Sequence, residues 1–259
     1  MIKKLFTENS ILCRLGSVML VIFLLLLFYY PFNRVTVLGL NSVVKPMKFA
    51  LSIWIYSWTM AIMLHYVKDI RKVKVYSWVA VVCMGFEQIA ISFQALRGTL
   101  SHFNKENTFG IILFSLMGVF ILTITIWTAY ITYIFIKQKT YDLHPAIVLG
   151  IKIGLIYFVI FSLFGGYISA LQGHTVGSVD GGKGLVFINW STSFGDLRVA
   201  HFFGIHSLQL IPLFAIAINK FFKTISVRKP IWAFSICYFL FVIFVMVQAI
   251  IEMPFIKFN

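Results

Sequence analysis

The residues whose types could do chemistry are concentrated in one glycine-rich polar stretch, residues 171–209, which interrupts an otherwise apolar chain. Imidazoles, carboxylates and a guanidinium are groups that bind transition metals, ligate haem iron or hold an anionic group. We therefore expect the functional site to include this stretch. The candidate site residues within it are His174, Asp180, Asp196, Arg198, His201, His206 and Gln209.

The spacing of the histidines does not match a known metal motif. His201 and His206 are separated by about 140° around a helix, so their rings do not share a face. The HExxH arrangement needs histidines at i and i+4. A transition metal or a haem would therefore need imidazoles from separate segments, and the candidate ligands are His102, His174, His201 and His206. A single histidine in a loop, as predicted for His102, is more often simply exposed to solvent than a metal ligand.

Glu87 is an ionisable residue near the middle of an apolar run. Such a group costs at least ~2.5 kcal/mol on insertion scales, so it faces a bundle interior, pairs or is protonated. At about 100° per residue, Gln94 falls within roughly 20° of Glu87 and continues a polar stripe toward Arg97 and His102. The functional interpretation of Glu87 is a proton relay, which would connect it with His206, or a ligand anchor. The structural interpretation is a hydrogen bond to a neighbouring helix.

Asp196 and Arg198 stand where the polar stretch becomes a helix. Asp196 has a structural interpretation, because aspartate caps helix N-termini and suits the helix dipole. The functional interpretation is that Arg198, with Arg97, holds an anionic group such as a substrate anion or a haem propionate. His206 and Gln209 lie at i and i+3, so they are neighbours on one helix. The tract that contains Asp180 lacks the GxxxxGK[ST] spacing, and nucleotide binding is not expected.

The composition is that of a polytopic membrane protein. The 259 residues are 60% hydrophobic and 12% charged, and the mean hydropathy is +0.94. Soluble domains carry about 25% charged residues and about 45–50% apolar ones. The net charge of +14 comes from short loops between apolar runs. Such cations are topology signals, so nucleic acid is not an expected partner. The three cysteines form no disulfide or zinc pattern.

Seven apolar runs are each long enough to cross the roughly 30 Å hydrocarbon core. The predicted fold class is therefore an all-α membrane bundle of about seven helices, formed by residues 1–259 as a single domain. Residues 172–198 form its outer loop and cover a polar, outward-facing pocket. The predicted spans are Ile11–Phe32, Met47–Val67, Val75–Leu96, Phe109–Ile136, Pro145–Leu171, Val199–Ile218 and Ile231–Ile251.

The distribution of lysine and arginine predicts an inside N-terminus and an outside C-terminus, because most of the 22 basic residues then lie on the inner side. The basic start lacks a small-residue cleavage site, so the first span is expected to be retained. In this orientation His102, His174, His201 and His206 all gather on the outer side. This convergence is the main sequence evidence for a site.

Several runs resemble stretches of a family of uncharacterised bacterial integral membrane proteins: VVKPMKFALS, QALRGTLSHFN, GHTVG, DGGKG and GDLRVAHFFGIHSLQ. The resemblance implies that these segments form one constellation and that the membrane is the bacterial cytoplasmic (inner) membrane. It implies no reaction, since no activity is attached to that family. Seven spans are shared with zinc hydrolases of the alkaline ceramidase type, but their HxxxH pair is absent here.

Three functional hypotheses remain open from the sequence. The first is a metal- or haem-binding membrane protein, and a redox enzyme is one form of this hypothesis. The second is a proton-linked small-molecule transporter that uses Glu87 and His206 as titrating groups. The third is a sensor or assembly factor whose outer loop recognises a ligand or a partner without doing chemistry. The lipid bilayer is an expected partner in all three, and a small molecule would bind at the outer face. The oligomeric state is not predicted.

Overall fold

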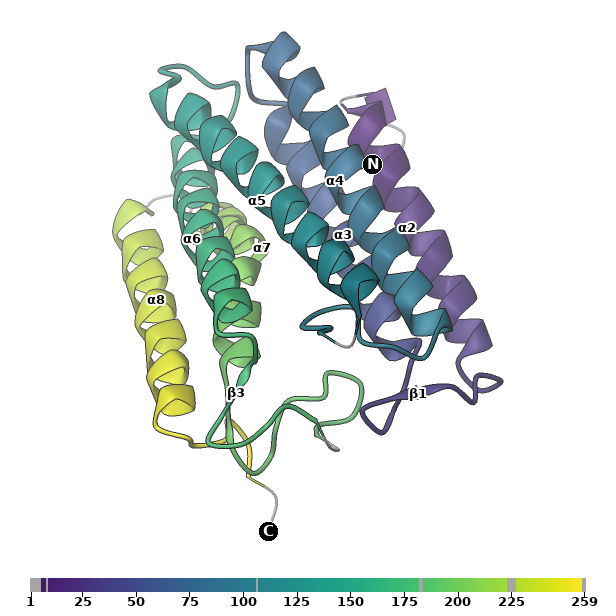
Figure 1. The fold of residues 1–259 in the computed structure, drawn as a ribbon. Helices are drawn as coiled ribbons and strands as arrows, with labels where there is room; N and C mark the ends of the chain where they lie inside the picture. Colours follow the sequence, from purple (N-terminus) through teal and green to yellow (C-terminus); the bar gives the residue numbers. More distant parts are fainter. Residues whose placement is uncertain (1–5, 8, 106, 182–183, 223–226, 258–259) are drawn as a thin grey trace. The chain divides into compact units, whose positions relative to one another are not determined.

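A computed structural model describes residues 6–7, 9–105, 107–181, 184–222 and 227–257. Within this described part, seven helices are each long and apolar enough to cross a membrane (Figure 1). The all-α membrane bundle is therefore confirmed, and the protein associates with a lipid bilayer. The predicted orientation stays a prediction. The helices are α2 (Ser10–Tyr29), α3 (Val44–Leu64), α4 (Ile70–Leu96), α5 (Thr108–Lys137), α6 (Pro145–Ala170), α7 (Leu197–Phe221) and α8 (Arg228–Ile250).

Side-chain caps fix the beginnings of several helices. The Asn9 side chain accepts from the backbone N–H of Leu12 at the start of α2, and Asp69 accepts from that of Lys72 at the start of α4. Each cap satisfies a backbone donor that the first helical turn leaves open. The cap at Asp69 explains why α4 begins five residues before the predicted span, within a basic segment that hydropathy alone leaves outside.

Contacts divide the chain into two compact units. Unit 1 comprises residues 1–127 and 181–189, and unit 2 comprises residues 128–180 and 190–259. The boundary falls within α5, and the polar stretch contributes to both units. The single domain and the covered outer pocket stay predictions. Gly182 and Lys183, within the DGGKG run, lie outside the described residues, as do Lys3 and Lys4 near the N-terminus.

Polar and close apolar contacts hold α2, α3 and α4 of unit 1 together. Gly16 on α2 leaves room for the Trp58 ring of α3, since a Cβ there would come within 2.4 Å of it. The Asn9 amide donates to Ser77 Oγ on α4 over 2.8 Å. Tyr56 on α3 and Tyr76 on α4 share a hydrogen bond between their hydroxyls. These bonds satisfy polar groups that the bilayer would leave without water.

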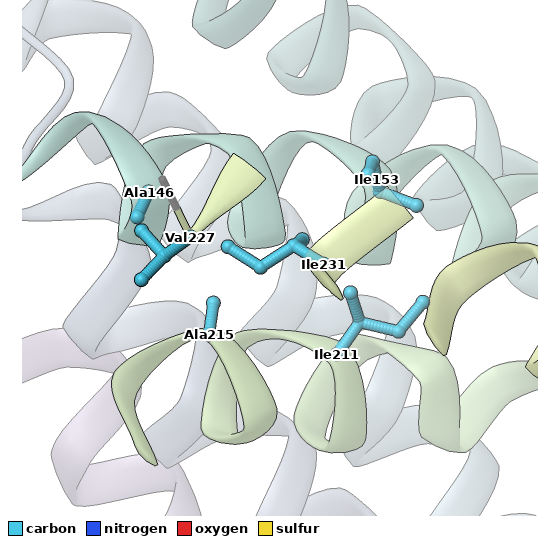
Figure 2. Packing of buried hydrophobic residues seen from close by; sticks show 6 residues of the cluster. All are labelled: Ala146, Ile153, Ile211, Ala215, Val227 and Ile231. Atoms are coloured by element: carbon cyan, nitrogen blue, oxygen red, sulfur yellow. The ribbon is translucent and has the colours of Figure 1, made fainter. Parts of the chain in front are cut away.

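In unit 2, α6 and α7 pack closely because α6 carries small residues on its α7 face. A Cβ at Gly154 would come within 2.9 Å of the Ser207 carbonyl oxygen, and one at Gly150 within 2.6 Å of the Ala215 side chain. Small residues of this kind let membrane helices approach each other. Figure 2 shows the apolar cluster beside this contact, where side chains of α6, α7 and the start of α8 point toward one another. Its members are Ala146, Ile153, Ile211, Ala215, Val227 and Ile231.

Two very short strand pairs order the connections between helices. Strands β1 (Thr36–Val37) and β2 (Leu40–Asn41) form an antiparallel hairpin between α2 and α3. Strands β3 (Thr175–Val176) and β4 (Gly195–Asp196) pair antiparallel within unit 2. The second pair matters for the site, because it joins the two ends of the loop of residues 172–198 just before α7 begins.

Candidate functional site

The buried Asp196 carboxylate accepts hydrogen bonds from Ser191 and Arg198. It is 1% exposed and caps α7 by accepting from the backbone N–H of Arg198 at 3.0 Å. It also accepts from the backbone N–H of Ser191 at 2.9 Å. The Arg198 guanidinium donates to both carboxylate oxygens, from Nε at 2.9 Å and from Nη2 at 2.6 Å. This geometry matches the structural interpretation of Asp196, and a bidentate pair of this kind is strong.

His174 lies beside Asp180 and Asp196 because β3 pairs with β4. Its Nδ1 is 3.2 Å from Asp180 Oδ1 and 3.8 Å from Asp196 Oδ1. The same Asp180 carboxylate accepts from the backbone N–H groups of His174 and Thr175. Gly177, at a φ of +93°, supplies the left-handed turn between them. We call His174, Asp180, Asp196 and Arg198 the His174 network.

His201 and His206 both bind backbone carbonyls of unit 2. His201 Nδ1 donates to the Phe161 carbonyl oxygen on α6 at 2.8 Å, and its ring occupies the space that Gly165 leaves open. His206 Nδ1 donates to the Phe202 carbonyl oxygen one turn earlier on α7 at 2.7 Å, with the two rings 4.1 Å apart. Each ring therefore has its own partner, as expected from their separation around the helix.

The Trp190 ring packs against aromatic side chains in the first turns of α7. Trp190 is 7% exposed, and its ring lies 5.3 Å from the Phe202 ring and 5.9 Å from those of Phe203 and Phe255. An aromatic cluster of this size is held mainly by the burial of apolar area.

No metal-ligand group forms within the part of the chain that the structure describes. There, no three histidine, cysteine, aspartate or glutamate side chains come together in an arrangement that could hold a metal ion. The proposed ligand set of His102, His174, His201 and His206 therefore stays a prediction, without support from the arrangement of these described residues. Gln209 lies on α7, three residues after His206.

In unit 1, Gln94 and Arg97 stabilise the turn that follows α4. The Gln94 amide donates to the Leu100 carbonyl oxygen at 3.0 Å, and its Oε1 accepts from Arg97 Nη1 at 2.9 Å. The Arg97 guanidinium also lies over the rings of Phe93 and Phe109, 5.5 and 5.1 Å from their centroids. Both side chains of the predicted stripe thus have structural partners.

His102 is enclosed by aromatic rings on the turn after α4. Its ring centroid lies 5.9 Å from that of Phe49 and 5.7 Å from that of Phe114, and Ser101 Oγ is 3.2 Å from Nδ1. Burial, reinforced by the positive charge of Lys45, holds the pKa of His102 well below its ordinary value. His102 is therefore a neutral imidazole at pH 7.

The Glu87 carboxyl group, unlike those of Asp180 and Asp196, accepts no hydrogen bond from the described residues. Glu87 is 1% exposed, and neither Oε1 nor Oε2 accepts a hydrogen bond from another described residue. The neighbouring Gln88 donates to the Pro46 carbonyl oxygen at 3.2 Å, yet its buried Oε1 is unpartnered within the same described part. Buried polar groups are normally bonded, so an exception is a candidate for function.

Lys45 is the cation whose positive charge acts on the Glu87 carboxyl group. It stands in the first turn of α3 and interacts electrostatically with both Glu87 and His102. We call Lys45, Glu87, Gln88 and His102 the Glu87 group. The sequence prediction missed Lys45 and Gln88. Consecutive spans run antiparallel, so the start of α3 lies beside the end of α4. This arrangement could have predicted that Lys45 lies near the stripe of Glu87.

No known protein family, curated protein or solved structure matches this chain. The chemistry of the two groups is therefore what indicates a function. The His174 network holds its charges in mutual contacts, whereas the Glu87 group contains a buried acid beside a cation and a neutral imidazole.

Proposed function

We propose that this integral membrane protein is a proton-linked transporter of a small molecule, in which Glu87 takes up and releases the proton. The observation that carries the proposal is the buried Glu87 carboxyl group, which accepts no hydrogen bond from the described residues. Ionisable residues inside membrane bundles mark proton relays and substrate pathways, because their burial is otherwise too costly to keep.

The proposed cycle follows from the cost of burying charge. A carboxylate ion without a partner is costly to bury, and the group avoids that cost by holding a proton. When the proton leaves, the resulting negative charge needs a cation. Lys45 supplies a positive field within electrostatic reach, and a bound substrate with a cationic group would supply a closer one. Substrate binding and proton release at Glu87 would then be coupled through one carboxyl group.

His206 is the second proton-binding group in this proposal. Its Nδ1 is held by the Phe202 carbonyl oxygen, which fixes the ring orientation on α7. We expect its role to be smaller than that of Glu87, since the imidazole already has a partner.

The other two hypotheses have less support. A metal or haem centre would use His102, His174, His201 and His206, but the described residues contain no group of three suitable ligands. Arg198, proposed to hold an anion, is engaged by Asp196 through Nε and Nη2. A sensor would depend on residues 172–198, where His174, Asp180, Asp196 and Arg198 are engaged with one another.

Proton flux in liposomes tests the proposal. The full chain would be reconstituted in vesicles that enclose a pH-sensitive dye, and amino acids, organic amines, carboxylates and sugars would be added in turn. We expect at least one class to move protons with the wild type and none to do so with Glu87→Gln. Glu252→Gln is the matched control, because Glu252 is exposed at the end of α8.

Each result bears on the proposal. Normal flux in Glu252→Gln combined with loss in Glu87→Gln supports it. A wild-type protein that moves protons with none of the solutes, or a Glu87→Gln variant that matches the wild type, shows that the proposal is wrong.

A further inference from the structure

A lipid-facing groove runs between α4 and α5 within unit 1. Its volume is about 550 Å³, and its wall is almost wholly apolar. On the α4 side it is formed by Val75, Trp78 and Val82, and on the α5 side by Val119 and Phe120. The three valines are 41–59% exposed, so the groove opens outward from the helices. A volume of this size falls in the range of small-molecule and lipid pockets.

Packing elsewhere explains why the helices leave a groove here. Farther along the pair, Ile91 of α4 and Met117 of α5 belong to one buried cluster. Phe86 stacks on Phe120, which lines the groove, with ring centroids 4.3 Å apart. Toward the first turns of α4, the facing residues are valines and Trp78, which are too short or too outward-pointing to fill the space.

Two cations border the open end of this apolar groove. Arg71 and Lys74 lie three residues apart in the first turns of α4 and line the groove, so they are neighbours on one helix face. Lys72, which lies between them in the sequence, forms an ion pair with Asp69, with Nζ 3.0 Å from Oδ2. Among the described residues, neither Arg71 nor Lys74 forms an ion pair within 4 Å or a side-chain hydrogen bond. The start of a helix also favours negative charge.

We propose that this groove binds an anionic phospholipid, with its phosphate on Arg71 and Lys74 and one acyl chain along the valines of α4 and α5. Two cations at the end of an apolar groove match the charge and the length of such a lipid. Basic pockets between membrane helices bind anionic headgroups in this way. The inference does not depend on proton transport, because Arg71, Lys74 and the valines of the groove are not part of the Glu87 group.

Native mass spectrometry of the intact protein in mild detergent tests the site. Phosphatidylglycerol and phosphatidylcholine of identical chain length would be added separately, so that only the headgroup charge differs. The wild type is expected to retain phosphatidylglycerol at least about tenfold better. Removing each cation, as Arg71→Gln or Lys74→Gln, should weaken phosphatidylglycerol binding about fivefold, from the contribution of one basic residue near a membrane surface.

Two further variants distinguish a lipid in this groove from a general effect of surface charge and from a second copy of the chain. Arg34→Gln removes an exposed cation from the segment between α2 and β1, and it should leave binding unchanged. Val82→Trp would fill the groove and should weaken retention of both lipids.

Three results would overturn the proposal. The first is equal retention of the two lipids by the wild type. The second is unchanged phosphatidylglycerol binding in the Arg71→Gln, Lys74→Gln double variant. The third is a dimer that Val82→Trp dissociates, since a second copy would then be the occupant.

Discussion

The His174 network and the Glu87 group contain similar residue types, but their buried carboxyl groups differ in hydrogen bonding. In the network, Asp196 accepts from two backbone N–H groups and from the Arg198 guanidinium. In the Glu87 group, an equally buried carboxyl accepts no hydrogen bond from any described residue. A charged residue that is fully partnered holds a fold together, whereas one that is buried without a partner weakens it and is kept for another reason. This difference supports a structural role for the first group and is the basis of the function proposed for the second.

The largest effect on stability is expected from Asp196→Ala. This change removes the cap of α7 and leaves the Arg198 guanidinium without its carboxylate partner. The free energy of unfolding should fall by about 3 kcal/mol, measured as the loss of helical signal on heating in detergent. Asp180→Asn, which keeps an acceptor for the backbone N–H groups, should cost much less. If Asp196→Ala unfolds at the wild-type temperature, the structural assignment of the network is wrong.

A smaller effect is expected from Gly165→Ala on α6. The new Cβ would come within 2.5 Å of the His201 ring, so the ring or the helix must shift. We expect a loss of about 2 kcal/mol, typical of overpacking. Gly166→Ala is the matched control, since nothing lies within 4 Å of a Cβ there, and it should be neutral or stabilising. Equal stability of the two variants would show that His201 has no packing role.

A still smaller effect concerns His102 and pH. Its pKa is lowered in the folded state, so the unfolded chain binds a proton first as the pH falls below about 6.5. The folded protein should thus lose stability below that pH, by at most about 1.4 kcal/mol per pH unit, and keep it above. Unfolding curves at several pH values would reveal this slope, and His102→Gln should reduce it. An unchanged slope in the variant would assign the effect to another group.

The smallest effect on stability is expected from Glu87→Gln. No hydrogen bond to a described residue is lost, so the free energy of unfolding should change by less than about 1 kcal/mol. Measuring the thermal unfolding of Glu87→Gln and of Asp196→Ala under the same conditions would compare the two regions directly. A loss as large as that of Asp196→Ala would mean that Glu87 is a structural residue after all.

The sequence was sufficient for the fold class but only partly for the site. Apolar run length identified all seven helices, because a span must match the thickness of the bilayer. The cap at Asp196 was also predictable, since aspartate before an apolar run is a helix-start signal. The start of α4 was placed too late, because the Asp69 cap precedes a basic segment that hydropathy does not recognise as helix.

The roles of the histidines could not be obtained from spacing. The partner of His201 is a carbonyl on α6, and which carbonyl it meets depends on the contact between α6 and α7 that Gly154 and Gly165 permit. Topology assigns a residue to one side of a membrane but gives no distance within that side. The bonding state of the Glu87 carboxyl was equally beyond a sequence pattern, because it depends on what every neighbouring helix presents at that depth.

Infrared difference spectroscopy of the Glu87 carboxyl group tests the central claim most directly. Spectra of the wild type and of Glu87→Gln would be recorded across the pH range in which the protein stays folded. If Glu87 takes up and releases a proton, subtracting the spectra of the variant from those of the wild type leaves a carboxylic-acid band that disappears as a carboxylate band grows. A wild-type spectrum that is identical to that of Glu87→Gln at every pH would contradict proton exchange at Glu87.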